Sequence, residues 1–302
     1  MSGVERTGNN TEYEAPFWEH VVELSVRLRR IVCAILISSI VLSVLPANWD
    51  FSSGAYVPLI SHFPSLIIQT VLPKQVGLFG RTYNVVIMPE SPFETFQIIL
   101  LSALLLGSIG ASPIIAREVW AYLEPALYPH EKKMVKKLVV ISVSLFLFGI
   151  WLAVYIVTPW TLRITLSIYP FFVPQGYEAI IRVSVSDVVT LTIELALALG
   201  VVLQTPLIMY YLLAGGILDP SMFSRESMKI AFVVMLFVGA IISPDPSGLG
   251  MIVIALLLYL PFYIAVKLGE KAYYKRILQE LVKEEEISVI KLKRGEHDGM
   301  QK

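Results

Sequence analysis

The feature that most constrains this chain is a series of long apolar runs with few charged residues inside them. An α-helix needs about 20 mainly apolar residues to cross the hydrocarbon core of a bilayer, which is about 30 Å thick. We predict membrane-spanning helices at residues 28–46, 91–115, 138–157, 187–213, 230–242 and 249–266. The predicted fold class is therefore all-α, a polytopic membrane protein with six transmembrane helices, of which the fifth and sixth are short.

The composition supports a membrane protein with a single domain. The chain has 302 residues, of which 56% are hydrophobic and 16% are charged, whereas soluble domains have roughly 45–50% and about 25%. The mean hydropathy is +0.70. A net charge of zero argues against nucleic-acid binding, which depends on neutralising phosphates. We expect one membrane domain over residues 1–302, with disordered tails at 1–16 and 285–302.

The lysine and arginine residues predict the orientation, because cytoplasmic loops of membrane proteins are enriched in both. If the N-terminus is cytoplasmic, 20 of the 24 basic residues fall on the cytoplasmic side. The external segments then contain only Lys74, Arg81, Arg163 and Arg182. We expect a multi-pass membrane protein with both termini in the cytoplasm.

Local signals refine these elements. Residues 17–30 indicate a short amphipathic helix at the membrane surface, before the first span. Ser91-Pro92-Phe93-Glu94 has the pattern of a capping box. Pro159 is expected to end the third span, and Pro206 to bend the fourth, because proline removes a backbone hydrogen bond.

The fifth span, residues 230–242, has 13 residues. Either flanking residues such as Met228 and Ser243 lengthen it, or the bilayer is locally thinned.

Few residues could support covalent or metal chemistry. Cys33 is the only cysteine and lies in an apolar run, so a cysteine metal site is excluded. The four histidines have no ligand spacing, and no phosphate loop, dinucleotide fingerprint or nucleophile elbow occurs. We expect no catalytic residues, no metal and no cofactor.

One carboxylate lies deep in a predicted span. An ionisable side chain there is costly, so Glu194 is a candidate functional residue. It could instead reach the membrane surface or bond a neighbouring helix. Gln204 lies ten residues further along, before Thr205-Pro206, where a polar side chain can satisfy carbonyls that a proline leaves free.

Two carboxylates lie near the predicted cytoplasmic face. Glu23 precedes the first span, and Glu131 follows the second. Taken alone, each is typical of a solvated surface close to basic residues.

Several segments resemble TatC, the multi-span core of the twin-arginine protein translocase. The most specific is Trp120–Glu131, with Ser91-Pro92-Phe93 before it. His20-Val21-Val22-Glu23-Leu24 resembles the N-terminal motif of that family. Pro58, in Val57-Pro58-Leu59, and Asp245, in Ser243-Pro244-Asp245, lie in segments similar to two external motifs.

The resemblance implies a receptor for signal peptides of folded export substrates. It places recognition of the paired arginines on two carboxylates, and carboxylates pair bidentately with guanidinium in a way that lysine does not reproduce. Carried over by position, the residues of this site are Glu23, Glu131, Tyr122, Pro125, Leu127 and Tyr128. The resemblance also implies single-span partners of TatA type, with or without TatB type, and a homo-oligomeric receptor in lipid. It further implies a location in a prokaryotic cell membrane and transport driven by the proton-motive force.

The chain departs from the family at two positions. Ser25 stands where the N-terminal motif has arginine, and Arg27 is the nearest substitute. Gln204 stands where the fourth span often has glutamate. We hypothesise that Glu194, about three turns toward the outer face, supplies the intramembrane acid.

Two other functional classes agree less well with the sequence. A secondary transporter usually has internal repeats and broken helices, whereas only Pro206 suggests a break here. An intramembrane enzyme needs a convergent nucleophile, base or metal site, and a single intramembrane glutamate argues against it.

Overall fold

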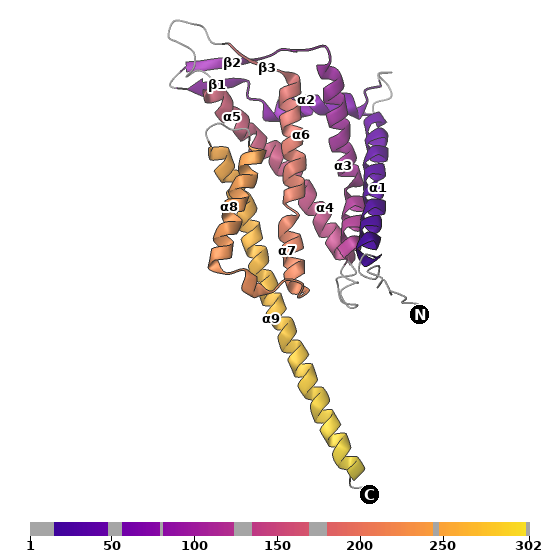
Figure 1. Ribbon diagram of the computed structural model, residues 1–302. Helices are drawn as coiled ribbons and strands as arrows, with labels where there is room; N and C mark the ends of the chain where they lie inside the picture. Colours follow the sequence, from indigo (N-terminus) through magenta and orange to yellow (C-terminus); the bar gives the residue numbers. More distant parts are fainter. Residues whose placement is uncertain are drawn as a thin grey trace, which may run out of the picture. The chain divides into compact units, whose positions relative to one another are not determined.

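The computed structural model describes residues 15–47, 56–78, 81–123, 135–168, 180–243 and 248–299 (Figure 1). These residues form mainly helices. They belong to two compact units, which are described separately. The first comprises Met1–Gln69, Pro89–Ser144 and Ser184–Ile193, and the second comprises Thr70–Met88, Leu145–Val183 and Glu194–Lys302.

Apolar helices dominate the described residues and confirm a helical membrane protein. Four segments are long and apolar enough to cross a membrane: Glu94–Tyr122, Lys137–Ile168, Val185–Ala214 and Leu249–Lys283. Two further helices, α1 (Ala15–Val44) and α8 (Arg225–Ile242), cover the first and fifth predicted spans. Each has three charged residues near one end of its apolar run, so a count of six spans stays a prediction.

Helix α1 is continuous from Ala15 to Val44, whereas the sequence pattern predicted a separate surface helix before the first span. No proline or glycine interrupts residues 17–44, so the backbone has no reason to break where the polar sequence becomes apolar. The predicted surface helix is therefore the first part of α1.

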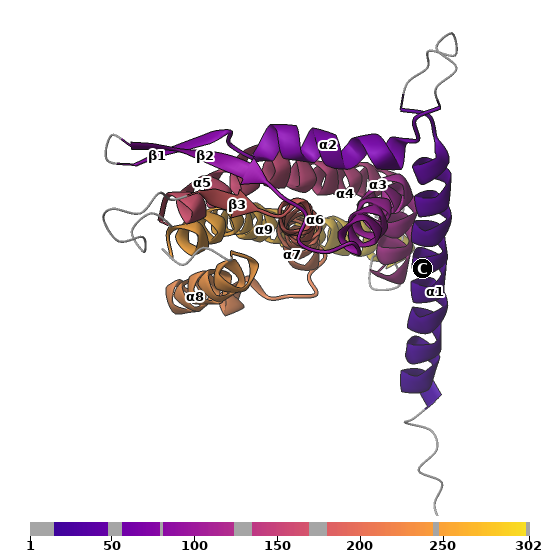
Figure 2. The same cartoon turned by 90° about the horizontal axis from the view of Figure 1, so that it is seen from above.

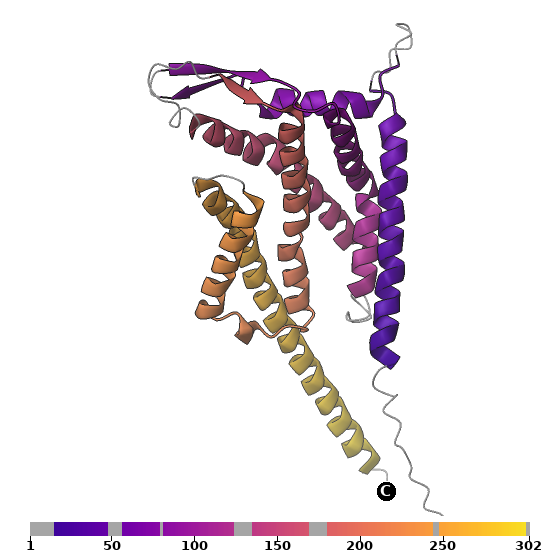
Figure 3. The same cartoon turned by 45° about the horizontal axis from the view of Figure 1, so that its top comes forward.

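In the first unit, α1 packs antiparallel against α3 (Glu94–Leu123), and the two helices lie side by side in Figures 1 and 3. Small residues form the contact. A Cβ atom added to Gly107 would overlap with Ser39 Oγ and lie 2.7 Å from the carbonyl oxygen of Ile35. Small residues of this kind let helix backbones approach closely in lipid, where the hydrophobic effect does not drive helix association.

The start of α3 confirms the predicted cap in a modified form. Glu94 Oε1 accepts a hydrogen bond from the backbone N–H of Glu90 at 2.7 Å, one residue before the expected Ser91. The Ser184 hydroxyl donates to the same oxygen at 2.7 Å. Glu94 therefore joins the start of α3 to the residue that precedes α6 (Val185–Val202).

The Pro58 motif connects α1 to α2 (Leu59–Val71). The backbone N–H of Ala47 donates to the carbonyl of Val57 at 2.8 Å, and that of Leu59 donates to the carbonyl of Leu45 at 2.7 Å. Pro58 lies between these two bonds, so this motif fixes how the chain leaves α1.

In the second unit, Pro159 does not end the third predicted span. The helix passes from α4 (Val135–Leu152) through a π-helical turn, Ala153–Val157, into α5 (Thr158–Ile168). The N–H of Thr158 donates to the carbonyl of Ala153, five residues back. This π turn shifts the hydrogen-bond ladder just before Pro159 and lets the helix continue.

The second unit also contains a small sheet that the sequence analysis did not predict. Its strands are β1 (Gln75–Leu78), β2 (Arg81–Ile87) and β3 (Ile181–Val183). Figure 2 shows β2 between the other two, antiparallel to β1 and parallel to β3.

The predicted bend at Pro206 is confirmed as a break between α6 and α7 (Thr205–Ala214). The Gln204 side-chain amide donates to the carbonyl of Gly200 at 3.2 Å. The backbone N–H of Gln204 instead donates to the carbonyl of Val201. Gln204 therefore satisfies a carbonyl at the break, as the sequence suggested.

The second unit ends in a helical pair, α8 and α9 (Leu249–Gly299), which lie side by side in Figures 1 and 3. A 3₁₀ turn, Pro220–Met222, precedes α8. Helix α8 starts five residues before Ile230 and includes Met228, and Ser243 caps its end, so the helix is longer than the predicted span. Whether the bilayer is thinned there is not tested by the helix length. Helix α9 continues through residues 285–299, where we expected a disordered tail. Glutamate, lysine and leucine in that segment favour helix.

Two glycines of α3 provide a matched test of the α1–α3 contact. Gly107→Ala should destabilise the protein by about 1–3 kcal/mol, because the new methyl group meets backbone. Gly110→Ala should cost less, because its nearest neighbour is the end of the flexible Leu42 side chain at 2.7 Å. Thermal unfolding in detergent measures both, and equal midpoints for the two variants would contradict this packing.

Candidate functional site

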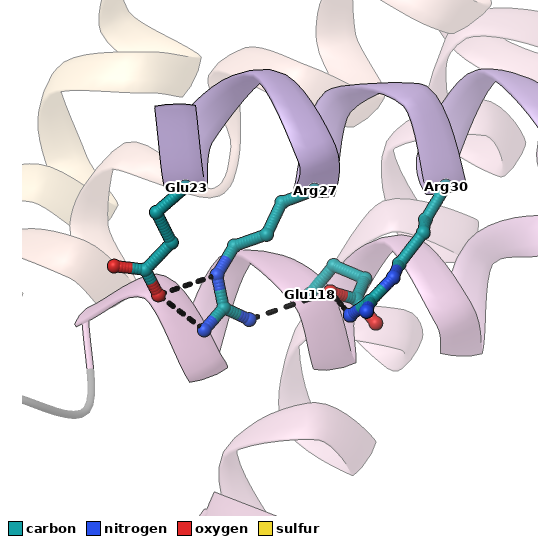
Figure 4. A network of polar contacts seen from close by, with 4 residues as sticks. All are labelled: Glu23, Arg27, Arg30 and Glu118. Carbon is teal, nitrogen blue, oxygen red and sulfur yellow. Dashed lines mark hydrogen bonds and ion pairs between the residues drawn. The ribbon is translucent and has the colours of Figure 1, made fainter. Parts of the chain in front are cut away.

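Four charged side chains link α1 to α3 in the first unit, and we refer to them as the α1–α3 charge network (Figure 4). Arg27 lies at its centre. Its Nη2 and Nε atoms donate to Glu23 Oε1 at 2.6 and 3.0 Å, and its Nη1 atom donates to Glu118 Oε2 at 3.3 Å. Arg30 Nη1 lies 3.5 Å from the same oxygen of Glu118. The network contains two carboxylates and two guanidinium groups, so its charges cancel.

Burial differs strongly across the network. The exposed fraction of the side chain is 6% for Glu118, 19% for Arg27, 38% for Glu23 and 59% for Arg30. A buried carboxylate is costly unless it is paired. Glu118 is therefore the anchor of the network, whereas Glu23 is its accessible carboxylate.

The two oxygens of Glu23 are used unequally. Both hydrogen bonds from Arg27 end on Oε1, and the second oxygen points away from Arg27 in Figure 4. Oε2 has no hydrogen-bond partner among the described residues. The hydrogen bond and the charge of Glu23 raise the pKa of Arg27 above its usual value, so Arg27 stays cationic. Glu23 can thus accept a further guanidinium group.

The remaining residues of the predicted site are only partly described. Tyr122 lies one turn beyond Glu118 on α3 and is 36% exposed. Pro125, Leu127, Tyr128 and Glu131 lie outside the described residues, as does Asp245 of the external motif. The proximity of Glu23 and Glu131 therefore stays a prediction.

Trp120, the first residue of the most specific segment, has a structural role. Its side chain is buried, and its indole N–H donates to the Ser142 hydroxyl on α4 at 2.7 Å. Because Trp120 lies only two residues from Glu118, this bond also fixes the end of α3 that carries the network.

The two intramembrane polar residues differ in their surroundings. Gln204 bonds the backbone at the α6–α7 break. Glu194 is exposed on α6 and has no hydrogen bond or ion pair with the described part of the chain. Of its two alternative roles, bonding a neighbouring helix is therefore not observed among these residues.

Sequence reasoning missed Glu118. The second predicted span ends at residue 115, which left Glu118 between two spans, where a carboxylate needs no partner, whereas α3 continues to Leu123. The apolar residues Ile114, Val119 and Tyr122 continue the helical pattern past Arg117. Extending the helix by that pattern would have placed Glu118 on it, opposite an arginine-rich helix end.

Comparisons with known proteins agree with the motifs. The family model "Sec-independent protein translocase protein (TatC)" matches residues 19–256. A similar protein is the Sec-independent protein translocase protein TatC of Aquifex aeolicus, 30% identical, with 86% of this chain and 97% of that protein aligned. Another is TatC of Haemophilus influenzae, 29% identical, with 78% and 82% aligned.

A solved structure shares the fold as well. The crystal structure of the twin arginine translocase receptor TatC superposes with a TM-score of 0.62 at 28% sequence identity. The match covers 84% of this chain and 99% of the other. Relatives and solved structure thus align over most of their length with this chain.

The unequal burial of the two carboxylates predicts unequal effects on stability. Glu118→Ala should lower the free energy of unfolding by about 2 kcal/mol or more, because two arginines lose a shared buried partner. Glu23→Ala should cost less than about 1 kcal/mol, as is typical of exposed pairs. Denaturation of both variants in detergent measures the difference, and an equal loss would show that Glu118 does not anchor the network.

Proposed function

The chain belongs to the TatC family, and from that premise we propose that it is the core receptor of a twin-arginine translocase. In this role it binds the signal peptides of folded proteins at the cytoplasmic face and organises partner subunits for export. The observation that carries the proposal is the partly exposed Glu23, whose second carboxylate oxygen points away from Arg27.

The recognition chemistry follows from the ligand. A twin-arginine motif presents two planar guanidinium groups, each of which can make two parallel hydrogen bonds to a carboxylate. We assign these contacts to Glu23 and Glu131, with Tyr122, Pro125, Leu127 and Tyr128 shaping the surface. The apolar part of the signal would lie against the spans, where burial of apolar area contributes most of the affinity.

The proposal extends to the setting of the receptor. The relatives in Aquifex aeolicus and Haemophilus influenzae support a location in a prokaryotic cell membrane. The basic residues support termini in the cytoplasm. The partners are TatA-type single-span subunits, a TatB-type subunit where the organism has one, and further copies of this chain. Transport is driven by the proton-motive force, and the receptor itself performs no covalent catalysis.

Peptide binding tests this function. A fluorescent twin-arginine peptide should bind the purified protein at least about tenfold more tightly than its twin-lysine version, because lysine cannot make the bidentate contact. Glu131→Ala should weaken binding of the twin-arginine peptide and abolish the preference for it over the twin-lysine peptide. If the wild type and Glu131→Ala each bind both peptides equally, the assignment of the site is wrong.

A second, independent test concerns Glu194, which we propose supplies the intramembrane acid of this receptor. Its exposed carboxylate lies on an apolar helix with no partner among the residues described, a costly placement in lipid. Glu194→Gln should reduce export of a twin-arginine substrate at least about tenfold, a loss comparable to that of a single charged contact. Asp187→Asn, on the exposed start of the same helix, is the control and should export normally. Wild-type export by Glu194→Gln would rule out this role.

A further inference from the structure

The resident partner of Glu23 is itself a guanidinium group. Arg27 makes two hydrogen bonds to Glu23 Oε1, at 2.6 and 3.0 Å. In the unliganded receptor, Arg27 therefore already occupies part of the carboxylate assigned to the arginine pair of the signal. A signal arginine must share this carboxylate with Arg27 or displace it.

Glu118 offers Arg27 a second partner on the opposite side. Arg27 Nη1 lies 3.3 Å from Glu118 Oε2, and the Glu118 side chain is only 6% exposed. A buried carboxylate of this kind needs its counter-ions whether or not a signal is present. Arg27 thus bridges an accessible carboxylate and a buried one (Figure 4).

We propose that Arg27 is a built-in competitor for the signal and that Glu118 is the positioning residue that retains Arg27 when a signal arginine takes Glu23. The inference rests on the proposed function of Glu23 and adds the mechanism by which its carboxylate is vacated. Binding is an exchange of one guanidinium for another, in which Arg27 keeps a charged partner throughout. The number of paired charges is then conserved, which lowers the cost of displacing Arg27.

The exchange predicts opposite effects for two substitutions. In Glu118→Gln, displaced Arg27 loses its charged partner, so the affinity for a twin-arginine peptide should fall about 5- to 10-fold. In Arg27→Lys, the net charge is unchanged but the two-bond contact with Glu23 is lost, so the affinity should rise about threefold. Arg27→Lys retains all carboxylates and therefore tests the competition without removing a buried group.

A double variant separates exchange from simple loss of charge. Glu118→Gln with Arg27→Gln removes both the competitor and its anchor, and should restore at least wild-type affinity. Glu118→Gln with Arg29→Gln has the same net charge, but Arg29 is exposed and has no partner among the described residues. This control should bind as weakly as Glu118→Gln alone.

The experiment is a titration of the full-length protein and its variants with fluorescent twin-arginine and twin-lysine peptides. The inference is overturned if Glu118→Gln binds like the wild type, if Arg27→Lys weakens binding, or if Arg27→Gln fails to rescue Glu118→Gln. A wild type that does not distinguish the two peptides contradicts the proposed function instead, so the two failures are distinguishable. Unfolding midpoints, measured in parallel, identify any variant whose weak binding comes from instability.

Discussion

The structure depends on one constraint: within lipid, each backbone N–H and C=O group must find its partner inside the protein. Prolines show how the chain meets it. Pro113 lies inside α3 and leaves the carbonyl of Ile109 without its usual donor, and the Ser112 hydroxyl donates to that carbonyl at 2.7 Å. At the α6–α7 break the Gln204 side-chain amide likewise donates to the carbonyl of Gly200. At both of these interruptions a nearby polar side chain thus satisfies the backbone carbonyl.

The same constraint applies to charge. Glu118 is nearly buried and is paired with two arginines, whereas Glu194 is exposed on an apolar helix and is unpaired within the described residues. A carboxylate with resident partners can be structural without any ligand. A carboxylate without them needs a partner from outside the described residues. This difference is why we assign an anchoring role to Glu118 and a transport role to Glu194.

Much of this fold was predictable because it follows from local pattern. The apolar runs predicted the helices, Pro206 predicted a break, and Ser91 to Glu94 predicted a cap. The predictions that were wrong concern how far a helix continues and what it then contacts. Nothing in the local pattern shows that a π turn carries the helix past Pro159. The pairing of Arg27 with Glu118 spans 91 positions and arises only from the antiparallel packing of α1 on α3. Glu23 was identified through its motif, whereas the pairing of Glu118 with Arg27 depends on how α1 packs against α3.

The α1–α3 charge network also bears on selectivity. A carboxylate that is simply exposed attracts any cation, and water and salt screen that attraction. Glu23 is instead partly occupied by a guanidinium fork that makes two hydrogen bonds. A lysine ammonium is a compact charge without that planar fork. It cannot reproduce both bonds at once, so it displaces Arg27 less effectively than another guanidinium does. A resident arginine therefore weakens the binding of every cation to Glu23. It weakens binding least for another guanidinium group, which has the same geometry as its own.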